Sequence, residues 1–183
     1  MNRLIETIDT PYWLALEDDW HFFVPASYIQ DALEIMGDDA SIGQVLFNRN
    51  YGLLLEHRNL IGGSVHVTKN GRLRYRVQDY YDRNTGAFDE FMKTLPPGGR
   101  TNAWWPHYSL HPSLVSMAAI RKIGHYNEDA RHFELEFAER YQATGFRTAF
   151  MDSINILHIG KQPWDPGDEL KNAYQLNDQR QFG

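Results

Sequence analysis

The 183-residue sequence contains no cysteine, which excludes disulfide scaffolds, zinc sites built on thiolates and cysteine nucleophiles. It has no run of about 20 apolar residues, so we expect no membrane-spanning helix. The N-terminal residues 1–6 lack the apolar stretch of a signal peptide, and we therefore expect a cytoplasmic protein. Basic residues are also few. Lys and Arg number 18 against 24 Asp and Glu, and the resulting net charge of −6 argues against general nucleic-acid binding.

The sequence does have enough apolar material for one folded domain. Hydrophobic residues make up 42% and aromatic residues 14%, which is more than disordered chains contain. The length also suits a single domain. We expect that domain to cover residues 1–160. Residues 161–183 are polar and contain Pro163 and Pro166, so we expect a C-terminal surface tail there.

Short apolar runs alternate with helical patterns along the chain, which predicts a mixed α/β fold. Asn70-Gly71 lies between two β-rich runs and predicts a β-hairpin insertion near 64–77. A long loop over 79–100 is expected to carry a short helix near 88–95. The remaining strands are expected at 12–16, 42–47, 146–151 and 154–159, with an extended stretch at 104–110. The remaining helices are expected from Pro25 to Gly37, from Pro112 to Arg121 and over 130–144.

Three acidic residues, Glu17, Asp18 and Asp19, directly follow the first predicted strand. Side chains alternate along an extended chain, so Glu17 and Asp19 can point to one side. Two such carboxylates repel each other unless a hard cation such as Mg²⁺ or Mn²⁺ lies between them. Ligands of open α/β sheets also gather at the carboxyl ends of strands. The alternative is an ordinary solvated acidic turn.

The predicted helix 130–144 separates two glutamates by their position on the helical wheel. Glu134 lies at the edge of the apolar stripe, whereas Glu136 faces the polar side. A carboxylate near a helix start and partly covered by aromatic rings is a candidate general base. The alternative is that Glu134 is a first-turn acid favoured by the helix dipole. The stripe consists of Phe133, Phe137 and Tyr141.

One histidine, His158, ends the last predicted strand. It could complete a metal site with Asp19. The alternative is a hydrogen-bonded structural histidine, since the chain has 8 histidines.

Four of these segments together resemble GT-A-fold glycosyltransferases of the family-two-like type. Residues 16–20, Leu-Glu-Asp-Asp-Trp, resemble the acidic "DxD" metal motif, and residues 123–128 are similar to the "G-x-F-D-E" turn. Residues 133–149 resemble the "E-D … G-Y-R" helix, in which Glu134 takes the place of the catalytic base. Residues 157–160, Leu-His-Ile-Gly, resemble the late "H-x-G" segment. The resemblance covers roughly residues 12–161.

The resemblance implies an inverting transfer of a sugar from a nucleotide-diphosphate sugar to an acceptor hydroxyl, such as that of a glycan. Mn²⁺ or Mg²⁺ would be held by Asp19 with Asp18 and His158, and Glu134 would deprotonate the acceptor. The donor diphosphate would contact Glu17, Asp18 and Trp20, and the acceptor would contact Trp104, Trp105 and His107. The alternative is that the tryptophan pair belongs to the core or to an interface, because each ring buries a large apolar area.

Two departures from the family pattern lead to further expectations. Glu17 replaces the Asp that usually begins the metal motif. Only 16 residues precede Glu17, whereas family members carry several β/α units there. We therefore expect an incomplete Rossmann-like domain, a GT-A-like mixed sheet flanked by helices. An upstream reading frame, a partner chain or self-association would supply the missing donor-binding half.

Two other functions use the same residues. The chain could be a non-catalytic carbohydrate- or protein-binding remnant of a glycosyltransferase. A metal-dependent phosphoesterase ranks last, because it normally needs more His and Asp ligands than the sequence places together. Arg72, Arg74 and Arg76 alternate on one face of the predicted hairpin, where they either face solvent or bind an anionic group.

Overall fold

The computed structural model describes residues 1–48, 60–94, 105–130 and 132–160, without the side chains of 60–64 and 78. Its elements, in chain order, are α1 (Asn2–Thr7), β1 (Tyr12–Ala15), β2 (Trp20–Phe22), α2 (Tyr28–Asp38), β3 (Ile42–Leu46), β4 (Leu60–Val67), β5 (Arg74–Tyr80), α3 (Gly86–Lys93), β6 (Ser113–Ser116), α4 (Met117–Ile123), α5 (Phe133–Ala143), β7 (Arg147–Met151) and β8 (Ile156–His158).

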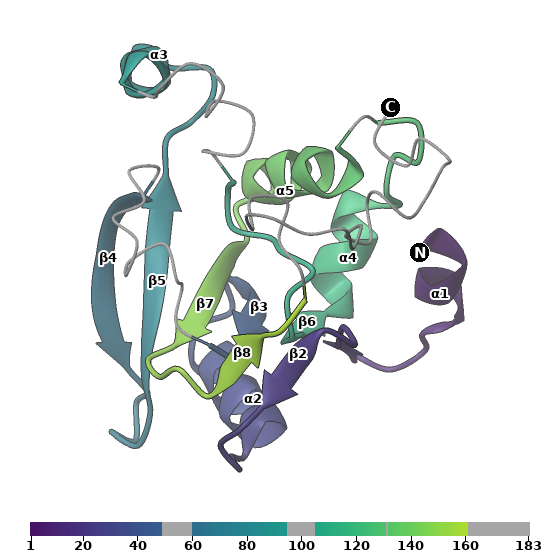
Figure 1. Cartoon of the computed structure of the whole chain (residues 1–183), viewed down its shortest axis with the longest axis vertical. Coiled ribbons are helices and arrows are strands. Elements are labelled where there is room, and N and C mark those ends of the chain that lie inside the picture. The colour runs from purple at the N-terminus through teal and green to yellow at the C-terminus, as the bar shows by residue number, and fades with distance from the viewer. Residues whose placement is uncertain (49–59, 95–104, 131, 161–183) are drawn as a thin grey trace, which may run out of the picture.

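Six strands form one mixed sheet in the order β1-β6-β3-β7-β5-β4, and β2 pairs with β8 in a separate two-stranded ribbon (Figure 1). Only β3 and β7 are parallel neighbours, and the other pairs are antiparallel. The predicted mixed α/β fold with a mixed sheet flanked by helices is confirmed. The hairpin is also present, but β5 pairs with β7, so the hairpin is the edge of the main sheet rather than an insertion outside it.

Helices cover both faces of the sheet, because alternate residues of each strand enter different cores. Leu114 of β6 belongs to the core under α2, and its neighbour Val115 belongs to the core under α4 and α5. Gly43 lets α5 approach β3, since a Cβ atom there would lie 2.6 Å from the Tyr141 hydroxyl oxygen. Residues of one strand thus hold two helical layers in place.

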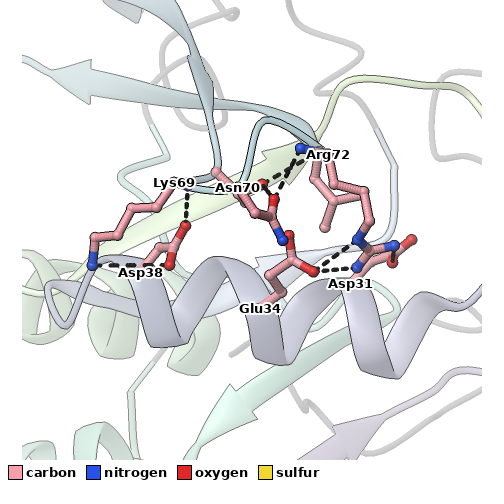
Figure 2. Close-up of polar contacts among 8 residues, drawn as sticks. Asp31, Glu34, Asp38, Lys69, Asn70 and Arg72 are labelled. Carbon is pink, nitrogen blue, oxygen red and sulfur yellow. Dashed lines mark hydrogen bonds and ion pairs between the residues drawn. The ribbon is translucent and has the colours of Figure 1, made fainter.

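The turn of the hairpin is attached to α2 by charged side chains (Figure 2). Arg72 forms ion pairs with Asp31, at 2.9 Å, and with Glu34. The backbone N–H of Lys69 donates to Asp38 at 2.5 Å. The hairpin arginines therefore have carboxylate partners in this structure.

The helix predicted from Pro112 to Arg121 is wrong in its first half. Residues 113–116 form β6, which pairs with both β1 and β3, and the helix starts only at Met117. Pairing on both sides overrides the helix-start signal of the proline, since Leu114 and Val115 each fill a core. The described part of 104–110 is a loop, not an extended strand. The predicted tail, 161–183, lies outside the described residues.

The strand register brings the ends of several strands together along one side of the sheet, which we call its ligand-binding edge. Ala15, Ser113, Leu46 and Phe150 form a row across β1, β6, β3 and β7. β1, β3 and β7 end at this edge, whereas β6 begins there because it runs antiparallel to its neighbours. The turn after β1 and the loop before β6 are therefore adjacent, as expected for the ligand-binding edge of an α/β sheet.

Candidate functional site

The acidic turn after β1 leads directly into the β2–β8 ribbon, and this ribbon places Asp19 beside His158. Trp20 is the register partner of His158, and the backbone N–H of Ile159 donates to the Asp19 carbonyl oxygen at 2.8 Å. The side chains meet as well, with Nε2 of His158 3.0 Å from Oδ2 of Asp19. Two segments almost 140 residues apart in the sequence thus supply one acid–histidine pair.

The Asp19 carboxylate has one buried oxygen and lies close to the backbone of Gly160. Its Oδ1 atom is buried and has no hydrogen-bond partner within the described part of the chain. A Cβ atom on Gly160 would come within 2.5 Å of Oδ2, so only glycine fits against this carboxylate. An unpartnered buried carboxylate oxygen is costly, which makes Oδ1 a candidate position for a bound cation.

Glu17 is the second acid of the turn. The indole N–H of Trp20 donates to its Oε2 at 3.1 Å. Desolvation raises the pKa of Glu17, the Trp20 hydrogen bond opposes this, and the negative charges of Asp19 and Asp18 add to it. Glu17 is nevertheless exposed, so water weakens these effects strongly. Asp18 is exposed.

Glu134 lies in the first turn of α5, and its side chain points to the loop before β6. Its Oε1 accepts hydrogen bonds from the backbone N–H of Leu110, at 2.7 Å, and from the Ser109 hydroxyl, at 3.4 Å. Desolvation raises the pKa of Glu134 to about 7, supported by the negative charge of Glu17 and opposed by both hydrogen bonds. Glu136 instead forms an ion pair with Arg140 at 2.6 Å, on the polar side of the helix.

The three residues predicted to bind the acceptor differ in how far they are exposed. Trp104 lies outside the described residues. Trp105 is half-buried, and its indole N–H donates to the Tyr108 carbonyl oxygen at 3.1 Å. His107 is only 6% exposed, its Nδ1 accepts from the Thr148 N–H at 3.3 Å, and burial lowers its pKa to about 4. His107 therefore anchors the loop, and the acceptor role of this segment stays a prediction.

One neighbour of the site, His111, has no place in the sequence motifs. Its ring lies 4.8 Å from that of Trp20. Desolvation lowers the pKa of His111 to about 4, the positive charge of His158 adds to this, and the negative charge of Asp19 opposes it. His111 immediately precedes Pro112 and β6. Knowledge that β6 pairs with β1 would have revealed it, because that register places the residues before β6 next to those after β1.

The predicted metal site at Asp19, Asp18 and His158 stays a prediction. No group of three or more His, Asp or Glu side chains suited to a metal ion occurs among the described residues. Asp19 and His158 supply a pair. Mg²⁺ is commonly bound by only one or two carboxylates, with substrate phosphates and water completing its shell.

A pocket of about 310 Å³ lies elsewhere, between α2, the hairpin and the loop after β7, and includes none of the candidate site residues. Its lining includes Asp31, Ile35, Arg74, Met151 and Asp152. Both acids form ion pairs with hairpin arginines, so we assign this pocket no function.

Comparisons with protein families, curated proteins and solved structures found no match to this chain. In the part of the chain that the structure describes, no helix is long and apolar enough to cross a membrane.

Proposed function

We propose that the chain is the catalytic part of a metal-dependent, inverting glycosyltransferase of the GT-A type. The observation that carries this proposal is the Asp19 carboxylate, which has one oxygen beside His158 and the other buried without a hydrogen-bond partner among the described residues. A second acid with a raised pKa, Glu134, interacts electrostatically with the same acidic turn through Glu17. The resemblance of the four sequence segments supplies the type of reaction.

In this proposal Asp19 and His158 hold Mn²⁺ or Mg²⁺, with Asp18 as a further ligand. When bound, the ion supplies Lewis-acid stabilisation of the departing nucleotide diphosphate. The indole of Trp20 keeps the Glu17 carboxylate oriented on the donor side of the turn. These residues bind and orient the donor.

Glu134 is the proposed base. Among the described residues its hydrogen bonds go to Oε1, and in this proposal Oε2 accepts the proton of the acceptor hydroxyl. A pKa of about 7 suits this task, because a substantial fraction of the side chain is ionised at neutral pH while the carboxylate remains basic.

Calorimetric titration with Mn²⁺ and a panel of nucleotide-diphosphate sugars tests the proposal. We expect donor binding that requires Mn²⁺, slow donor hydrolysis, and loss of both in Asp19→Asn. The matched control is Glu6→Gln, which alters another acid–histidine pair. In that pair, Glu6 lies 3.4 Å from His125 and both side chains are more than half exposed. The control should behave as the unaltered protein does.

Two results would contradict the proposal. If Asp19→Asn binds Mn²⁺ and donor as well as Glu6→Gln does, the acid–histidine pair is not the metal site. If glycans bind without metal and no nucleotide sugar binds under any condition, the chain is a carbohydrate-binding protein instead.

A further inference from the structure

The loop before β6 is held by a side chain from the middle of the sheet. Gln44 of β3 is fully buried. Its Nε2 donates to the Ser109 carbonyl oxygen at 2.5 Å, and its Oε1 accepts from the Ser109 N–H at 3.2 Å. One primary amide thus pairs with both backbone groups of one loop residue, much as a neighbouring strand would.

Two further hydrogen bonds fix the orientation of this amide. Nε2 of Gln44 also donates to the Ser113 hydroxyl at 2.9 Å, and Oε1 accepts from the Thr148 hydroxyl at 3.3 Å. Both amide protons and the amide oxygen therefore have partners on three sides. Rotating the buried amide would break several hydrogen bonds at once, which is unfavourable where water cannot replace them.

The loop residue that Gln44 holds is adjacent to the contacts of Glu134. The Ser109 hydroxyl and the N–H of the next residue, Leu110, are the two donors to Glu134 Oε1. Fixing the Ser109 carbonyl group sets the direction of the Leu110 N–H, because both belong to the same planar peptide group. The Ser109 hydroxyl extends from the same held residue and also accepts from the His111 N–H at 3.3 Å. The sequence separates Gln44 from Glu134 by 90 positions, and Ser109 hydrogen-bonds to both residues.

We propose that Gln44 is a positioning residue for Glu134, acting through the backbone of Ser109. Its amide keeps the Leu110 N–H directed at Oε1 and holds the residue that carries the Ser109 hydroxyl, so that among the described residues the hydrogen bonds of Glu134 go to Oε1 rather than Oε2. The role of Glu134 as a catalytic base rests on the proposed function, whereas the hydrogen bonds that hold Ser109 and Glu134 are independent of it.

The test is a titration of the Glu134 carboxyl carbon by NMR in the whole chain, comparing the unaltered protein with Gln44→Met. Methionine has a similar size but cannot pair with the Ser109 backbone. Both donors favour the charged form of Glu134, so their loss should raise its pKa by about one pH unit. Glu17 also acts on Glu134, and its own titration is followed in the same spectra. Tyr108 and Tyr126 interact electrostatically with Glu134 as well, but burial raises the pKa of both tyrosines, so they stay neutral over the range in which Glu134 titrates.

Ser113→Ala is the matched control, because it removes one hydrogen bond of Gln44 but keeps both bonds to Ser109. We expect it to shift the pKa of Glu134 by less than about 0.2 unit. An unchanged or lowered pKa in Gln44→Met would overturn the proposal, as would equal shifts in Gln44→Met and Ser113→Ala.

A second measurement needs no variant and holds even if Gln44→Met does not fold. In the unaltered protein, the side-chain amide protons of Gln44 should exchange with solvent at least about tenfold more slowly than those of the exposed Gln30. Equal exchange rates would overturn the proposed clamp on Ser109. Neither measurement requires a sugar donor, so the absence of transferase activity would count against the proposed function and leave this inference standing.

Discussion

Carboxylates near the hairpin and carboxylates near the end of β1 have different kinds of partner. Beside the hairpin, Asp31 pairs with Arg72, while Asp152 pairs with Arg74 at 3.2 Å and Arg76 at 2.5 Å. The candidate site has four acids: Glu17, Asp18, Asp19 and Glu134. In the described part of the chain, none of these four forms an ion pair with Lys or Arg.

This difference separates a structural use of charge from a functional one. Paired acids attach the hairpin to α2 and to the end of β7, and their loss should weaken the fold. Acids that are desolvated beside like charges reduce stability instead, and such groups are concentrated at functional sites. Removing a charge should therefore have opposite effects on stability in the two regions.

The largest effect is expected at Glu134. Its pKa rises from the usual 4.5 to about 7 on folding, so between these values the folded protein keeps a proton that the unfolded chain releases. Stability must then fall as pH rises through this range, by up to about 3 kcal/mol. Glu134→Gln should lack this fall, because its amide does not ionise but can still accept from Leu110 N–H.

Urea denaturation at several pH values between 4 and 8 measures this difference. Other groups titrate as well, so the informative quantity is the stability of Glu134→Gln minus that of the unaltered protein. This difference should become more positive as pH rises, which means that the variant becomes relatively more stable. A difference that stays constant from pH 4 to 8 would show that Glu134 titrates normally.

Removal of the Asp152 charge is expected to destabilise the protein, whereas removal of the Glu134 charge stabilises it. Its side chain is 12% exposed, and that of Arg76 is 16% exposed, so Asp152→Asn leaves a largely buried guanidinium without its charged partner. Breaking a fully buried pair costs about 3–5 kcal/mol, and the remaining solvent access here reduces this to about 2 kcal/mol. Urea denaturation at pH 7 measures the loss.

Glu90→Gln provides the matched control, because Glu90 pairs with Lys93 on the surface, with both side chains about 70% exposed. That change should alter stability by less than about 0.5 kcal/mol. If Asp152→Asn and Glu90→Gln behave alike, the arginine pairs of the hairpin contribute no more than ordinary surface pairs.

Much of the fold follows from local sequence patterns. The helical spacing after Pro25 predicts α2, although the helix continues past Gly37 to Asp38. Asn70-Gly71 predicts the hairpin, and Gly71 adopts a φ of 76°, which glycine tolerates best. The helical wheel also separates Glu134 from Glu136 correctly, because amphipathicity is a property of the helix alone.

The contacts that complete the site depend on strand pairing, which one sequence does not reveal. β6 was expected to be helical, and its position between β1 and β3 depends on partners far away in the chain. His111 lies near Trp20 only because of that pairing. Gln44 looks like a polar interruption of an apolar strand until the loop it holds is seen.

The smallest effect is expected at Glu17. This substitution tests most directly whether removing a charge at the candidate site stabilises the protein. Glu17→Gln keeps an oxygen that can accept from the Trp20 indole N–H but removes a charge that burial, Asp19 and Asp18 all disfavour. The attraction of His158 is lost as well and offsets part of the gain. Because Glu17 is exposed, solvent screening limits the stabilisation at pH 7 to at most about 0.5 kcal/mol. The gain should shrink in high salt, which screens repulsion between like charges. Denaturation at low and high salt measures both effects. A destabilised variant would mean that Glu17 is held by favourable charge interactions, as Asp152 is, and the two regions would no longer differ in kind.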